Sequence, residues 1–367
     1  MTDKLMKKQP ATKAGSCSAL SRVVGALLRP GLRLAGIAAY HAGLARHIIN
    51  LSPERVRTLL YHVVDANPGS LTRGLGTSVS PAVFRTHLDY FQRYYNVSSI
   101  DEVTAGTARQ CALLITFDDG YKSVYSNAAI ELESRGMPAT VYLISRTFLG
   151  EMVWVNRINQ ALNEYPVEAL QIVSGFSGME AVELADAIQR IQVTLTPPEI
   201  EELVQQLIEA LPDLAQGSEL FLTEQEVLDM QKRGFSFGFH SRDHYNLQLC
   251  SSHTLDEQLD TSEIAHLLNT PTFAYPFGYC GDREANRLAK KGYKRIMLVN
   301  DDTPTPRVEN LKRSEPSSPR ASHVFAEMEV VTPVLSWLKN RGCGMQRATN
   351  ARLIDNKSTV QKPASPA

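Results

Sequence analysis

The chain has 367 residues, of which 43% are hydrophobic and 21% are charged, and its formal net charge is −1. These values are typical of a soluble globular protein with one large domain or two smaller ones, and we expect no nucleic-acid partner. The five cysteines are scattered and include no CxxC pair, which excludes a disulfide framework or a zinc knuckle and favours a reducing compartment.

The first 50 residues are strongly basic. They carry a charge of +7, so the rest of the chain carries −8. From Leu27 to Ile37 apolar residues alternate with arginines, a pattern typical of a helix on an anionic membrane surface. A spanning helix would need about 20 apolar residues. We therefore expect 1–54 to be a partly disordered basic arm, on a protein that is cytoplasmic or peripheral on the inner face of the membrane. A helix packed on the main domain, and export by an atypical signal, are the alternatives.

Strands and helices alternate along the rest of the chain. The patterns predict strands at 57–63, 112–116, 139–144, 235–239, 272–275 and 294–299, and helices that begin near Ser80, Ser123, Thr223 and Glu284. Residues 151–220 are polar and helical and form a predicted insertion, whereas 341–367 predict a disordered tail. Such alternation favours a parallel sheet, in a β/α barrel or an open α/β sheet, with the site at the carboxyl ends of the strands.

Two short motifs follow predicted buried strands: TFDDG at 116–120 and HSRDH at 240–244. The first offers two adjacent carboxylates, and the second offers two imidazoles four residues apart. One carboxylate and two imidazoles can hold a divalent metal with open coordination positions, which leaves the other carboxylate as a base. Each motif alone also fits a turn or a pair of surface histidines. Their common position after strands favours a shared site.

A third motif, FAYPFG at 273–278, also lies at a predicted strand end. Its proline and glycine would fix an unusual backbone, which could present a peptide N–H to a developing oxyanion. One such donor contributes about 2.7–4 kcal/mol in acyl chemistry. The alternative is a turn that only terminates the strand.

Together the three motifs resemble those of the polysaccharide deacetylase family, also called the NodB-homology domain. The resemblance covers about residues 55–300 and includes Leu60-Tyr61-His62. It implies a distorted parallel β/α barrel at 55–340, with 151–220 as a helical insertion. It also implies a metal-dependent hydrolase of carbon–nitrogen bonds, which removes N-acetyl groups from amino sugars of a polysaccharide or its precursor.

The resemblance implies a role for each motif residue. Asp118 is the base that acts on a metal-activated water. Asp119, His240 and His244 are the metal ligands, with Zn²⁺ as the expected ion. The backbone N–H of Phe277 helps the metal to polarise the acetyl carbonyl.

The chain departs from the family pattern in two respects. Family members carry an arginine that steadies the base where this chain has Ala274, and we expect Arg313 to replace it. The late leucine–x–histidine motif, which supplies the general acid in the family, is not evident in this sequence, so the acid is left open. Tyr61 and His62 are candidates to line the cleft, although we interpret His62 as a buried structural histidine.

Two other functions fit part of the pattern. A catalytically weakened barrel that binds glycans would account for Ala274 and for the missing acid. A non-haem Fe(II) oxygenase also uses two histidines and a carboxylate, but that class has an antiparallel fold and a different ligand order. The expected partners are an N-acetylated glycan or lipid-linked sugar, and an anionic membrane surface that would contact residues 1–50.

Overall fold

The computed structural model describes residues 15–52, 56–176, 178–180, 182–211, 214, 219–298 and 309–338. The chain divides into two compact units: residues 52–320 form one, and residues 1–51 together with 321–367 form the other. The main domain expected at 55–340 therefore extends across both units. The tail expected at 341–367 lies outside the described residues.

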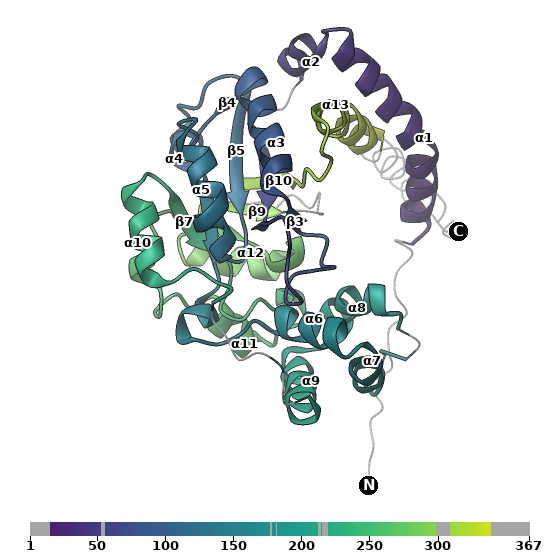
Figure 1. Ribbon diagram of the computed structural model, residues 1–367, viewed down its shortest axis with the longest axis vertical. Helices are drawn as coiled ribbons and strands as arrows, with labels where there is room; N and C mark the ends of the chain where they lie inside the picture. Colours follow the sequence, from purple (N-terminus) through teal and green to yellow (C-terminus); the bar gives the residue numbers. More distant parts are fainter. Residues whose placement is uncertain are drawn as a thin grey trace, which may run out of the picture. The chain divides into compact units, whose positions relative to one another are not determined.

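Seven parallel strands form a closed barrel in the unit 52–320 (Figure 1). They are β1 Val56–Tyr61, β5 Ala112–Phe117, β6 Thr140–Leu143, β7 Ser236–Phe239, β8 Thr272–Ala274, β9 Arg295–Leu298 and β10 Glu309–Ser314. The order around the ring is β1-β10-β9-β8-β7-β6-β5, and β1 also pairs with β5 and so closes it. The predicted parallel β/α barrel is thus confirmed, and the open sheet is not what forms.

Three short strands lie outside this ring: β2 Val63–Val64, β3 Ser78–Val79 and β4 Asn96–Val97. β4 pairs with the start of β5, and β2 pairs with β3 in a separate sheet. Sequence patterns predicted six of the barrel strands to within a few residues and missed β10.

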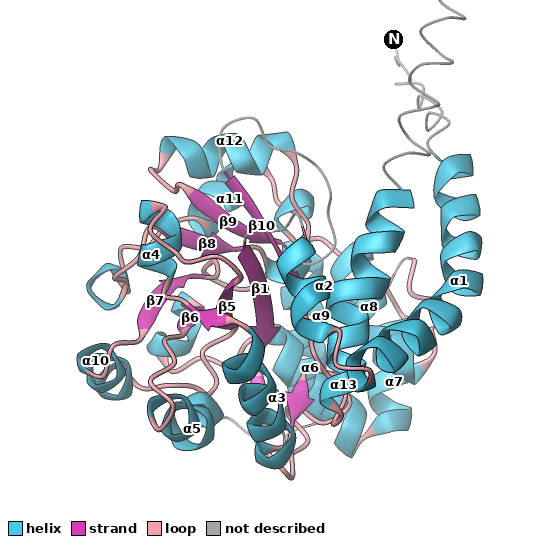
Figure 2. Cartoon of the chain, turned by 90° about the horizontal axis from the view of Figure 1, so that it is seen from above, coloured by secondary structure: helices cyan, strands magenta, loops and turns pink. Residues whose placement is uncertain are grey.

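Helices cover the outside of the barrel, as the view in Figure 2 shows. They are α3 Pro81–Tyr94, α4 Ile100–Ala105, α5 Ala129–Glu133, α10 Glu224–Lys232, α11 Ser252–Gln258 and α12 Asp282–Lys290. Ser80 caps α3 by accepting from the N–H of Val83 at 3.3 Å, and Thr223 and Glu226 form a capping box on α10. Every residue of β5 to β8 is buried, because helices cover the outer face of the strands while side chains fill the interior.

The connection between β6 and α10 contains four more helices: α6 Trp154–Glu164, α7 Pro166–Ser174, α8 Ala187–Thr194 and α9 Pro197–Ala210. They lie together beside the barrel in Figure 1. The capping box of α9 is formed by Thr196 and Glu199, and its buried stripe includes Ile200, Leu203 and Leu207. The region expected to be a helical insertion is therefore a small helical layer with apolar contacts of its own.

The other unit contains α1 Gly15–His41, α2 Ala45–Leu51, α13 Ala321–Phe325 and a π-helical stretch at Ala326–Val331. Helix α1 packs closely on α13 and the π-helical stretch: a Cβ placed on Gly36 would lie 2.7 Å from the Cβ of Ala326. Arg33 contributes an ion pair with Glu327 at 3.0 Å. Within the described part of the chain, no helix combines the length and the apolar character that a membrane crossing requires.

Candidate active site

The three sequence motifs lie at the carboxyl ends of β5, β7 and β8, and all three strands run in the same direction. Five non-glycine residues in the described chain have a positive φ, and four of them belong to these motifs: Asp119, Ser241, His244 and Phe277. Such a conformation costs about 1–3 kcal/mol at each residue and is typically found at functional sites. Gly120, with φ 70°, lets the chain turn directly after the aspartate pair.

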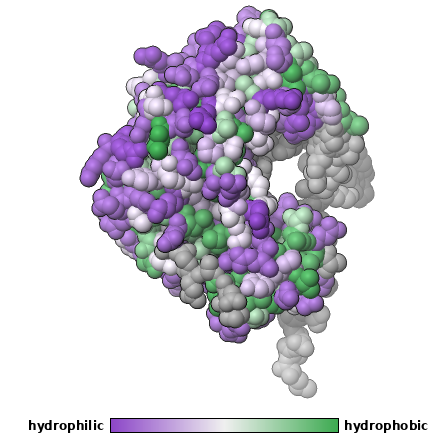
Figure 3. All heavy atoms as spheres, in the orientation of Figure 1, coloured by the Kyte–Doolittle hydropathy of each residue, from purple (hydrophilic) through white to green (hydrophobic). Residues whose placement is uncertain are grey.

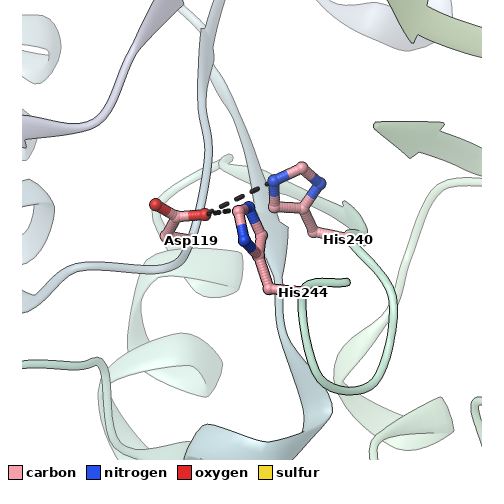
Figure 4. Close-up of side chains that lie close together, drawn as sticks. All are labelled: Asp119, His240 and His244. Atoms are coloured by element: carbon pink, nitrogen blue, oxygen red, sulfur yellow. Dashed lines mark ion pairs between the residues drawn. The ribbon is translucent and has the colours of Figure 1, made fainter. Parts of the chain in front are cut away.

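Three side chains at this edge form a candidate metal site (Figure 4). Asp119 Oδ1 lies 3.4 Å from Nε2 of His240 and 3.3 Å from Nε2 of His244. One ligand atom from each of the three residues lies within 4.8 Å of the others. Asp119 Oδ1 is buried and accepts no hydrogen bond from a described residue, which fits an oxygen whose partner is a cation. The residues present therefore fit the metal that the sequence motifs imply.

The two histidines are held in a form that can bind a metal. Nδ1 of His240 donates to the carbonyl of Ala274 at 2.7 Å, so in the neutral ring it is Nε2, on the side of Asp119, that carries the lone pair. Burial lowers the pKa of His244 to about 4, which keeps this imidazole neutral at pH 7, as a metal ligand must be. For His240, burial alone would lower the pKa, but the charges of Asp118 and Asp119 raise it above its usual value.

Asp118, which is also buried, is held by Arg313. The two guanidinium nitrogens Nη1 and Nη2 donate to Oδ1 and Oδ2 of Asp118, each at 2.6 Å, and the arginine side chain is fully buried. Strand β1 lies between the two strands concerned: Thr58 pairs with Arg313 in β10 and with Leu114 in β5, the strand that ends directly before Asp118. Burial by itself would raise the pKa of Asp118, but Arg313 and His240 lower it by more, so that it ends below its usual value. The carboxylate is therefore ionised at neutral pH, as a base must be.

The remaining motif residues lie around this core. The ring of Phe277 packs on His244 with centroids 4.6 Å apart, and Phe277 has a φ of 58°. Asp243, between the two histidines, accepts from Nε of Arg146 at 2.7 Å and from Nε2 of Gln258 at 2.5 Å. These contacts anchor the loop that carries both histidines. Asp243 is outside the ligand group formed by the described residues.

His62 does not behave as the buried structural residue that we expected. Strand β1 ends at Tyr61, so His62 lies at the carboxyl end of the barrel, and its side chain is 14% exposed. Tyr61 pairs with Phe117 and its carbonyl accepts from the N–H of Asp118 at 3.0 Å, so His62 lies beside the aspartate pair at the strand ends. Tyr61 points the other way and shares a hydrogen bond with Nδ1 of His87 at 2.9 Å. The Leu60-Tyr61-His62 motif pointed to His62, but we predicted that the strand ends at residue 63, which placed this histidine inside the strand.

Comparison with known proteins gives one family and several similar folds. The family model described as Polysaccharide deacetylase matches residues 105–296. A search of curated proteins gave no match.

Among solved structures, the deacetylase PplD of Streptococcus pyogenes, in complex with acetate, is 18% identical, with 73% of this chain and 96% of that chain covered and a TM-score of 0.48. The polysaccharide deacetylase BC0361 of Bacillus cereus is 18% identical, with 75% of this chain and 69% of that chain covered and a TM-score of 0.47. IcaB of Ammonifex degensii is 16% identical, with 75% of this chain and 97% of that chain covered and a TM-score of 0.46. The family match spans more than half of the chain and includes the TFDDG, HSRDH and FAYPFG motifs. The chain belongs to the polysaccharide deacetylase family, whose members are hydrolases of carbon–nitrogen bonds.

Proposed function

We propose that the chain is a metal-dependent deacetylase that removes N-acetyl groups from amino sugars of a polysaccharide or its precursor. The observation that carries the proposal is the buried Asp118–Arg313 pair directly beside the ligand group of Asp119, His240 and His244. The all-parallel barrel argues against a non-haem Fe(II) oxygenase, because that class is expected on an antiparallel fold.

The residues divide the chemistry among them. A divalent metal, with Zn²⁺ as our candidate, would act as a Lewis acid on the acetyl carbonyl and would acidify a water. Asp119, His240 and His244 would hold it. Asp118 takes the proton of the attacking water, because a carboxylate keeps lone pairs beyond the two that Arg313 occupies. The N–H of Phe277 donates to the oxyanion that develops on the acetyl group.

His62 is our candidate for the group that protonates the leaving amine. Its Nδ1 is buried and has no hydrogen-bond partner among the described residues, and Oε1 of Glu315 lies 3.6 Å away. Imidazole is the side chain that most often transfers protons near neutral pH. This assignment would fill the role for which the sequence offered no late histidine motif.

Acetate release tests the proposed function. Purified protein loaded with Zn²⁺ or Co²⁺ is expected to release acetate from oligomers of N-acetylglucosamine or from lipid-linked N-acetyl amino sugars. A chelator should abolish this release, and added metal should restore it, because the attack depends on the acidified water. Metal-loaded protein that bound glycans but released no acetate from any N-acetyl or O-acetyl glycan would favour the weakened glycan-binding barrel instead.

We further propose that residues 1–50 attach the protein to the anionic inner face of the membrane. The charge of +7 supports this, as do Leu27 and Leu34, which are 75% and 68% exposed on α1; Figure 3 shows apolar residues on the surface of this helix. Arg29 and Arg33 face Glu327 instead. Each basic residue near an anionic surface contributes about 1 kcal/mol of attraction.

Sedimentation with vesicles tests this attachment. Glutamate at the four lysines Lys4, Lys7, Lys8 and Lys13 is expected to abolish co-sedimentation of the full chain with phosphatidylglycerol-containing vesicles. The matched control changes four barrel-unit lysines to glutamate: Lys232, Lys290, Lys291 and Lys294. Equal binding by both variants would contradict the proposal, because the net charge is the same in each.

A further inference from the structure

Helix α6, the first helix of the insertion, contacts the candidate metal site at two points. Nε1 of Trp154 donates to the backbone carbonyl of His244 at 2.9 Å, and Nδ2 of Asn156 donates to the hydroxyl of Tyr121 at 3.0 Å. Trp154 and Asn156 are 2% and 1% exposed, so both hydrogen bonds are shielded from water. The insertion is therefore in direct contact with the loops that carry the ligands.

The first contact supports the loop of His244. This residue has a φ of 61°, a conformation that persists only where the surroundings determine it. Its N–H donates to Oγ of Ser241 at 3.0 Å, and its carbonyl accepts from Trp154. The ring of Phe277 lies against both residues, with centroids 4.6 Å from His244 and 5.9 Å from Trp154. The carbonyl, the N–H and the imidazole of His244 are thus each in contact with a fixed neighbour.

The second contact leads to Asp119 through Tyr121. The amide Nδ2 of Asn156 can only donate, so the oxygen of Tyr121 accepts there and its own proton is available to another acceptor. Asp119, two residues earlier in the same tight turn, is that acceptor. The tyrosine ring is fixed by stacking on Phe221, with centroids 5.3 Å apart and planes 17° apart.

We propose that α6 positions two of the three candidate metal ligands: Trp154 fixes the backbone of His244, and Asn156 orients the carboxylate of Asp119 through a hydrogen bond from Tyr121. Loss of such an outer partner typically weakens metal binding by about 10–100-fold. This inference rests on the metal binding that the proposed function requires, but it does not depend on the sugar substrate.

Metal affinity measures these contacts without any turnover. Tyr121→Phe removes one hydroxyl and keeps the ring stacked on Phe221, and Trp154→Phe removes the indole N–H and keeps an aromatic ring beside Phe277. Competition with a chelator for Zn²⁺ is expected to show about 10–100-fold weaker binding in each variant. The visible spectrum of bound Co²⁺ should also change, because ligand orientation determines it.

The control removes a buried tyrosine hydroxyl of another part of the barrel unit. Tyr90→Phe deletes the 3.0 Å hydrogen bond to Tyr95 at the end of α3, and it should keep the wild-type metal affinity. Thermal unfolding of the metal-free proteins shows whether the three variants are destabilised to the same extent. Zn²⁺ affinities of Tyr121→Phe and Trp154→Phe within twofold of wild type would overturn the inference. Failure of the proposed function would show separately, as wild-type protein that binds Zn²⁺ but releases no acetate.

Discussion

Asparagine at position 118 is expected to lower the rate of acetate release by roughly 10²–10⁴-fold, the usual contribution of a positioned base. Asparagine has nearly the same shape as aspartate, and its oxygen can still accept from Arg313, but it cannot take a proton from water. Because Asp118 is outside the ligand group, the Zn²⁺ affinity of the variant should stay close to that of wild type. Acetate release and chelator competition on the same preparations give both values.

A second variant separates the base from the acid. His62→Gln should lose most activity on N-acetyl sugars, whose amine leaving group needs a proton, but should retain hydrolysis of an aryl acetate, whose phenolate leaves without one. Asp118→Asn should lose both activities, since water must be activated in either case. If His62→Gln lost both to the same extent, the assignment of His62 as proton donor would be wrong. Unchanged acetate release by Asp118→Asn would remove Asp118 from the mechanism.

Methionine at position 313 is expected to cost about 3–5 kcal/mol of folding free energy, because it leaves the buried Asp118 carboxylate without its partner. The double variant Arg313→Met/Asp118→Asn should regain much of this loss, since no buried charge remains. Urea unfolding of the two single variants and the double variant closes a thermodynamic cycle. Arg287→Met is the matched control: Arg287 and its partner Asp256 are 35% and 50% exposed, so the expected cost is only about 0–1 kcal/mol.

The destabilisation should depend on pH in a defined direction. In wild type the pKa of Asp118 lies below its usual value of 3.8, so the ionised form adds stability above that pH, and this is lost as the pH falls through the lowered pKa. Without Arg313, burial becomes the larger influence, and the pKa of Asp118 should rise. The ionised form then opposes folding, and the stability gap to wild type should widen from pH 4 to pH 7. A gap that stayed constant over this range would contradict the proposed charge pairing.

The sequence was sufficient to predict most of the barrel and the strand ends that carry the motifs. It missed β10 because the inward residues of that strand include Arg313, and a buried arginine has the hydropathy of a surface residue. Its partner, Asp118, lies 195 residues away in the chain, so no local pattern relates them. The structure explains the buried charge of Arg313 by its ion pair with Asp118, which hydrophobic periodicity in the sequence could not indicate.

The insertion illustrates a different limit. Its helical character could be predicted from the sequence because the signals are local, as the capping box and apolar stripe of α9 show. The contacts of Trp154 and Asn156 with the ligand loops depend on tertiary packing and leave no periodic signal. Likewise, apolar residues near 321–331 indicate burial but do not name the element that covers them, which in the structure is α1.

The position of β1 in the ring has a consequence for when the Asp118–Arg313 pair can form. This first strand lies between the strand that precedes Asp118 and the strand that contains Arg313, which is the last to be made. Synthesis proceeds from the N-terminus, so a nascent chain has both aspartates and both histidines long before it has the arginine. Until residue 313 arrives, the sheet keeps two open edges and Asp118 has no guanidinium partner. We therefore expect closure of the barrel and formation of the Asp118–Arg313 pair to coincide, late in the translation of this unit.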